Sequence, residues 1–116
     1  MISSEGRVEA VNNLAEMIKF RTVSGEGALN GAYNKCGEWL LNMLLDTGIE
    51  AFILPESKPN KPIVVAKWTG LEPDSPSVLL NGHYDVVPAF EADWTVPAFA
   101  GLVKDEIIYG RGVQDM

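Results

Sequence analysis

Residues 78–88 of this chain read VLLNGHYDVVP. Three consecutive apolar residues open the stretch, which is typical of a strand buried on both faces of a sheet. His83 and Asp85 follow at the carboxyl end of this strand, where open α/β sheets bind their ligands. Because side chains alternate along an extended backbone, both would point to the same side. An imidazole can bind a metal, and a carboxylate two residues on can fix its tautomer. On spacing alone, a plainer interpretation is favoured: a histidine under a loop, beside an aspartate that starts a turn.

The segments around this stretch predict an α/β class. Apolar residues three or four apart predict two helices, and β-branched runs bounded by loops predict two strands and a hairpin. The helices are expected over residues 7–20 and 33–44, the strands over residues 49–54 and 63–68, and the hairpin over residues 102–109. The connections between strands are short enough for antiparallel neighbours, so we expect a mixed sheet.

The two predicted helices carry end signals and apolar faces. Ser3 and Ser4 can cap the first helix, and Gly48 stands where a left-handed cap would end the second. The apolar face of the first helix consists of Val8, Val11, Ala15 and Ile18, and that of the second of Tyr33, Cys36, Trp39, Leu40, Met43 and Leu44.

Composition excludes several classes of protein. The 116 residues fit one domain. The net charge of −7 argues against a basic surface that could bind nucleic acid or an anionic membrane. One cysteine cannot form an internal disulfide, no secretory signal is visible, and no apolar run approaches the ~20 residues of a membrane span. These features predict a cytoplasmic protein.

Residues 109–116, which read YGRGVQDM, form the second candidate motif. Asp115 can be a metal ligand or a helix cap, and taken alone the cap is favoured. A catalytic zinc site usually has three protein ligands, but the chain has one histidine, and Cys36 lies on an apolar helix face. Such a site would therefore need carboxylates. The other acidic candidates lie in polar loops or turns, where a solvated charge is the simple interpretation: Asp74, Glu91, Asp93, Asp105 and Glu106.

Three motifs in order now support a resemblance. They are residues 82–88, then Trp94 with Pro97 and Phe99, then residues 108–112 with Asp115 and Met116. Together they resemble the aminoacylase/carboxypeptidase family of dinuclear-zinc amidohydrolases and peptidases, which includes relatives of acetylornithine deacetylase. The sequence is most similar to the aminoacylase-1 and carboxypeptidase S-like branch. The specific match covers residues 78–116.

The resemblance implies a role for each candidate residue. His83 matches the first histidine ligand of one zinc, and Asp115 matches the carboxylate that bridges the two metal ions. Asp85 matches the catalytic-site aspartate that hydrogen-bonds and orients the histidine. Two Zn²⁺ per complete site are implied, with Co²⁺ or Mn²⁺ as substitutes, and family members use a metal-activated water to attack an amide carbonyl.

The resemblance also implies that residues 1–116 are the N-terminal portion of a three-layer α/β/α zinc-peptidase-like catalytic domain. The general base, the other ligands and a dimerisation domain would lie outside this chain, so we expect no turnover by the chain alone. The expected partners are an N-acyl amino acid or short peptide, the rest of the same enzyme, and a second copy in a homodimer. Two alternatives stay open: a carboxypeptidase or dipeptidase of the same family, and a non-catalytic truncated module.

Overall fold

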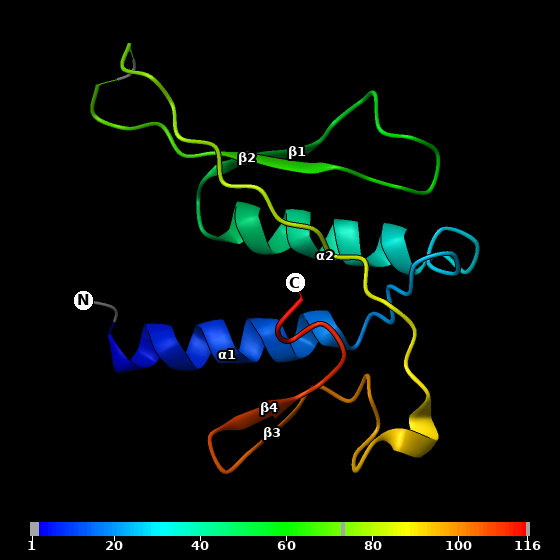
Figure 1. Cartoon of the computed structure of the whole chain (residues 1–116). Helices are drawn as coiled ribbons and strands as arrows, with labels where there is room; N and C mark the ends of the chain where they lie inside the picture. Colours follow the sequence, from blue (N-terminus) through cyan, green and yellow to red (C-terminus); the bar gives the residue numbers. More distant parts are fainter. Residues whose placement is uncertain (1–2, 73, 116) are drawn as a thin grey trace.

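The computed structural model describes residues 3–72 and 74–115. Within these residues it contains, in order, α1 (Ser4–Ile18), α2 (Ala32–Asp46), β1 (Glu50–Ile53), β2 (Val64–Lys67), the short 3-10 helix η1 (Glu91–Asp93), β3 (Leu102–Lys104) and β4 (Ile107–Tyr109). Figure 1 shows these elements stacked in the order β1–β2, α2, α1, β3–β4. This small α/β arrangement confirms the predicted class. Neither helix in the described part of the chain has the length and apolar content that crossing a membrane requires.

The first helix is capped as predicted but is buried over only part of its length. The Ser3 side chain accepts a hydrogen bond from the Gly6 N–H at 3.0 Å, which satisfies one of the free donors of the first turn. Ala15 and Ile18 are buried, whereas Val8, on the same predicted apolar face, is 60% exposed. The chain around Gly101 packs on the backbone of Ala15 and covers only the last turns of α1.

The second helix packs directly on the first sheet. Tyr33 and Cys36 are buried, as the apolar face predicts. A Cβ atom at Gly37 would lie 2.7 Å from Cγ of Pro62, so the absence of a side chain there lets the helix approach the chain that enters β2. Gly48 has φ 81°, which confirms the predicted left-handed residue after the helix.

The strands form two separate antiparallel pairs. β1 pairs with β2 in the register Glu50↔Lys67, and β3 pairs with β4 as the predicted hairpin. Asp105 and Glu106 both have positive φ, at 52° and 63°, as a two-residue type I′ turn requires. Where the sequence predicted one mixed sheet, the described strands make two small ones, and the parallel pairing is an isolated bridge, Val23↔Val86.

The apolar segment 78–80 does not form the predicted strand. Val78, Leu79 and Leu80 are 86%, 88% and 90% exposed. In the view of Figure 1 this part of the chain crosses α2 as an extended segment without regular secondary structure. In the part of the chain that the structure describes, no other strand lies beside it to complete a hydrogen-bonded ladder.

Candidate metal centre

The site lies where residues 83–86 meet the loop after α1 and the turn after β4. Val86 donates its N–H to the Thr22 carbonyl at 2.9 Å and accepts from the Ser24 N–H at 2.8 Å. Gly112 has φ 100°, and a Cβ there would lie 2.7 Å from Cγ1 of Val86. Glycine is therefore required for this close approach, which carries the chain end with Asp115 toward His83.

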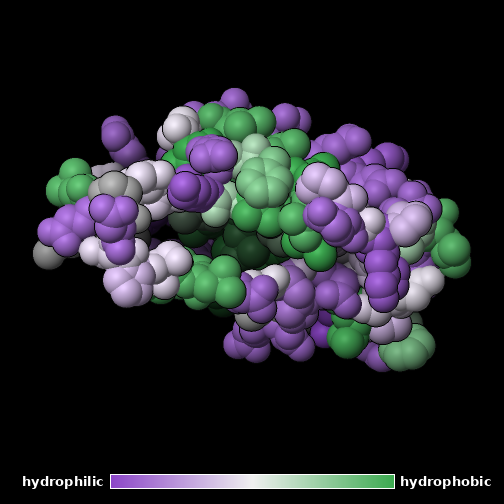
Figure 2. Space-filling view, turned by 90° about the horizontal axis from the view of Figure 1, so that it is seen from above, coloured by the Kyte–Doolittle hydropathy of each residue, from purple (hydrophilic) through white to green (hydrophobic). Residues whose placement is uncertain are grey.

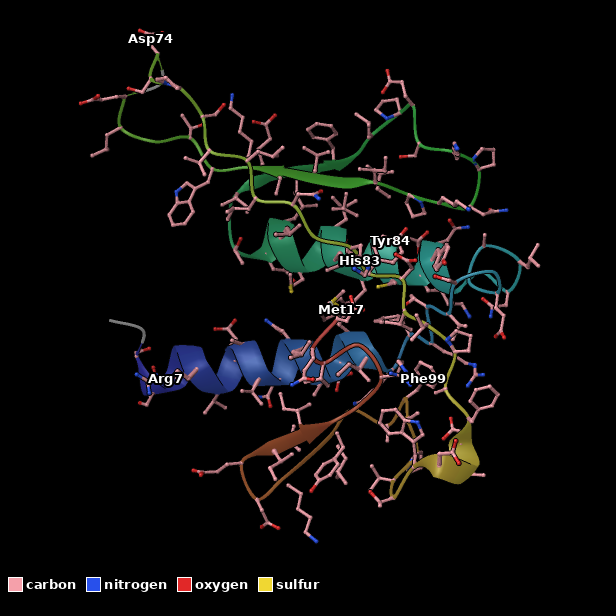
Figure 3. The ribbon with its side chains drawn as sticks, in the orientation of Figure 1. Arg7, Met17, Asp74, His83, Tyr84 and Phe99 are labelled. Carbon is pink, nitrogen blue, oxygen red and sulfur yellow. The ribbon has the colours of Figure 1, made fainter. Side chains whose placement is uncertain are left out.

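His83 and Asp85 lie on the same side of the chain, as the alternation of an extended backbone predicts. Nδ1 of His83 lies 2.9 Å from the Asp85 carbonyl oxygen and 3.1 Å from Asp85 Oδ1. Tyr84, between them, points the other way: its hydroxyl donates to the Pro62 carbonyl at 2.7 Å and its ring packs edge-on against Tyr33. Figure 3 shows His83 and Tyr84 over α2, with Met17 rising from α1 toward them.

The second nitrogen of His83 faces Asp115. His83 Nε2 lies 3.4 Å from Asp115 Oδ1, and the Asp115 side chain is 84% exposed. Two ligands at zinc distances of about 2.0–2.1 Å in tetrahedral geometry stand about 3.3 Å apart. The separation of these two donor atoms therefore fits a pair of ligands on one metal ion.

Electrostatics within the site couple the three side chains. The pKa of His83 is raised, first by its hydrogen bond to the Asp85 carbonyl and further by the carboxylates of Asp85 and Asp115. The pKa of Asp85 is lowered, above all because the Ser24 hydroxyl donates to its Oδ2 at 2.6 Å, with His83 adding to the effect. The structure thus favours an ionised Asp85 beside the imidazole.

Ser24 is a residue that sequence reasoning missed. It stands in the glycine-rich loop between α1 and α2, and its partner Asp85 is 61 positions away along the chain. A serine beside a glycine is typical of any loop, so the sequence carries no local signal for this contact.

The other candidates stay apart from the site. The thiol of Cys36 is fully buried, and burial raises its pKa to about 11, so it behaves as the core residue the sequence predicted. Trp94, one of the motif residues, lies under the guanidinium of Arg111, whose Cζ is 5.2 Å from the ring centroid. Among residues 3–72 and 74–115, no cluster of three or more His, Cys, Asp or Glu side chains forms a complete metal site.

A cavity of about 650 Å³ opens beside His83. Its apolar walls include Met17 from α1 and Leu40 from α2, and the stretch from Leu80 to Asp85 forms another side. Figure 2 shows a hollow in this molecule with hydrophobic residues on its walls and floor. His83 and Asp85 thus stand at the edge of a largely apolar cavity.

Several known proteins are similar to this chain over part of their length. Residues 79–116 match Peptidase family M20/M25/M40. The chain is 45% identical to aminoacylase-1 of Sus scrofa over 62 residues, which cover 53% of this chain and 15% of that protein. It is 54% identical to aminoacylase-1 of Dictyostelium discoideum over 57 residues, which cover 47% and 14%. It is 31% identical to a probable carboxypeptidase S-like 1 of Dictyostelium discoideum over 115 residues, which cover 96% and 23%.

These matches confirm the resemblance read from the motifs. The chain is similar to members of the aminoacylase and carboxypeptidase branch of Peptidase family M20/M25/M40. It spans between 14% and 23% of the length of the three relatives described above.

Proposed function

We propose that this chain is the N-terminal portion of the catalytic domain of a metal-dependent amidohydrolase that cleaves the amide bond of N-acyl-L-amino acids. One observation carries the proposal: His83 presents Nε2 to Asp115 Oδ1 at 3.4 Å, while its Nδ1 is held by Asp85. Two relatives named aminoacylase-1 support the substrate class.

Zinc is the metal we propose, because imidazole and carboxylate are among its usual ligands. When bound, zinc would polarise the amide carbonyl and lower the pKa of a water molecule so that it becomes a nucleophile. In this chain, His83 and Asp115 would hold the metal. Asp85 would keep the Nδ1 proton of His83 in place, so that the Nε2 lone pair stays free for the metal.

The rest of the site would come from polypeptide outside this chain. Catalytic zinc usually has three protein ligands, and the described residues bring together two candidates. The exposed apolar segment Val78–Leu80 supports the same idea, because an apolar strand of this kind is stable when neighbouring strands and helices cover it. We therefore propose that a longer polypeptide, called here the complete protein, adds the remaining layers of an α/β/α domain and a dimerisation domain. The homodimer and the cytoplasmic location stay predictions from the sequence.

A peptidase of the same family is the second candidate function. The match to the probable carboxypeptidase S-like protein extends over 96% of this chain, further than the two aminoacylase-1 matches. Both functions would use the same metal chemistry, so they differ in the substrate that the complete protein accepts.

The test is a parallel assay of the complete protein with zinc on N-acetylmethionine and on a dipeptide. We expect faster hydrolysis of N-acetylmethionine, and loss of both zinc binding and hydrolysis in His83→Ala. Preference for the dipeptide would favour the peptidase, and zinc binding without hydrolysis of either compound would favour a non-catalytic module. Residues 1–116 alone are expected to turn over neither substrate.

A further inference from the structure

A side chain outside residues 78–88 and 109–116 reaches the candidate metal centre. The Ser24 hydroxyl donates to Asp85 Oδ2 at 2.6 Å. This length is typical of a hydroxyl that donates to an ionised carboxylate, which is among the stronger hydrogen bonds in proteins. Ser24 therefore holds the carboxylate that in turn contacts His83.

The backbone around this contact is fixed on both sides. The Ser24 N–H donates to the Val86 carbonyl at 2.8 Å, and the Val86 N–H donates to the Thr22 carbonyl at 2.9 Å. The Thr22 hydroxyl also donates to the carbonyl of Tyr84. The side chains beside these bonds are buried, with Val23 1% and Val86 8% exposed. Because both backbones are already ordered, the Ser24 side chain loses little further freedom when it bonds Asp85.

The two oxygens of Asp85 have separate partners. Oδ2 accepts from Ser24 at 2.6 Å, while Oδ1 lies 3.1 Å from Nδ1 of His83. A carboxylate held at one oxygen cannot turn freely, so its other oxygen stays toward the imidazole. Metal-bound histidines depend on such a partner for their tautomer and ring orientation.

We propose that Ser24 is a positioning residue of the metal site, which acts through Asp85 to keep His83 oriented with Nε2 free toward Asp115. The inference rests on the proposed function. It adds the loop after α1 to the two segments, residues 78–88 and 109–116, that hold His83, Asp85 and Asp115.

The test compares Ser24→Ala with Ser75→Ala in the complete protein. Ser75 also donates to a carboxylate, that of Glu72 at 3.2 Å, in the loop that follows β2, so Ser75→Ala is a matched control. We expect Ser24→Ala to weaken zinc affinity about 10-fold, the lower end of the range for partners beyond the ligands. Competition with a chromophoric chelator measures this affinity, and the visible spectrum of the Co²⁺-loaded protein reports any change in ligand geometry. Ser75→Ala should match the wild type in both.

Activity and conservative variants separate positioning from general stability. Ser24→Ala should lower kcat and leave KM for N-acetylmethionine unchanged, whereas Ser24→Thr, which keeps a hydroxyl, should restore zinc affinity. If Ser24→Ala fails to fold, Ser24→Gly also removes the hydroxyl without adding a metal-binding group, and the same loss of zinc affinity is expected. Zinc affinity equal to wild type in the folded Ser24→Ala or Ser24→Gly variant would overturn this inference and leave the proposed function standing. A wild-type protein that binds no zinc would overturn the proposed function together with it.

Discussion

The two halves of residues 78–88 are adjacent in sequence and opposite in environment. Val78, Leu79 and Leu80 are at least 86% exposed, whereas Val86 is 8% exposed and bonded on both sides to the loop after α1. The half that carries His83 and Asp85 is thus ordered by contacts within this chain. The apolar half that precedes it has exposed side chains and is hydrogen-bonded to no strand among the described residues. The comparison teaches that contacts with the loop after α1 are enough to hold His83 and Asp85 in place, although the apolar segment before them has no strand partner among the described residues.

The largest expected effect comes from removing the carboxylate of Asp115. Asp115→Asn in the complete protein should weaken zinc affinity at least about 100-fold, beyond the range typical of outer-shell partners, because it removes a proposed anionic ligand. Equilibrium competition with a chelator measures the change. The control is Asp105→Asn, at an exposed turn position with φ 52°, where asparagine is well tolerated. Equal loss in both variants would show that net charge, not ligation, sets the affinity.

The next effect tests the close packing between the turn after β4 and Val86. Gly112→Ala should lower the free energy of unfolding by about 2 kcal/mol, because φ is 100° and the new Cβ would lie 2.7 Å from Val86 Cγ1. Chemical denaturation of the complete protein measures this loss. Gly70→Ala, where a Cβ would meet nothing within 4 Å, is the matched control and should be close to neutral. A harmless Gly112→Ala would mean that this half of the stretch is not ordered by the turn.

A smaller effect is expected from a single hydrogen bond of the ordered half. Thr22→Val removes the hydroxyl that donates to the Tyr84 carbonyl and should cost about 1 kcal/mol of stability. Thr69→Val, at an exposed position beyond β2, should cost nothing measurable in the same denaturation experiment. If the two variants are equally stable, the hydrogen bond from Thr22 to Tyr84 does not help to order residues 84–86.

The last prediction concerns how well backbone amides are protected from hydrogen exchange, and it needs no substitution. In residues 1–116 alone, amides of residues 78–82 should exchange with solvent faster than those of Ser24 and Val86, which are hydrogen-bonded. In the complete protein, residues 78–82 should become protected, because we propose that further strands and helices cover them. Hydrogen exchange read by mass spectrometry measures both states. Equally fast exchange in the two would contradict the proposed cover.

Local patterns in the sequence predicted much of the fold. The cap at Ser3, the buried Tyr33 and Cys36 of α2 and the hairpin of β3 and β4 are all set by residues near one another in the chain. The sequence did not predict which part of the apolar face of α1 is covered, or that Val78 lies outside any strand ladder. Apolar periodicity marks a face that can be buried and does not supply the partner that buries it.

The candidate site, too, could be predicted only where its contacts join residues close in sequence. The contact between His83 and Asp85 follows from a spacing of two residues, so the sequence could anticipate it. The approach of Asp115 to His83 depends on the close packing of Gly112 on Val86. The contact between Ser24 and Asp85 depends on the bridge between Val23 and Val86. These segments lie about sixty positions apart, and composition and periodicity carry no signal for their pairing.

The bridge between residues 22–24 and 84–86 also has a consequence for how the chain folds. Its first contact must close a loop in which Thr22 and Tyr84 are 62 positions apart. Closing a flexible loop of that size costs about 3.5 kcal/mol of chain entropy. Once one of these bonds has formed, the others join segments that are already neighbours and add almost no further entropic cost. The bonds should therefore form and break together, late in folding and in one step, so that a partly folded chain has either the whole ordered half of the site or none of it.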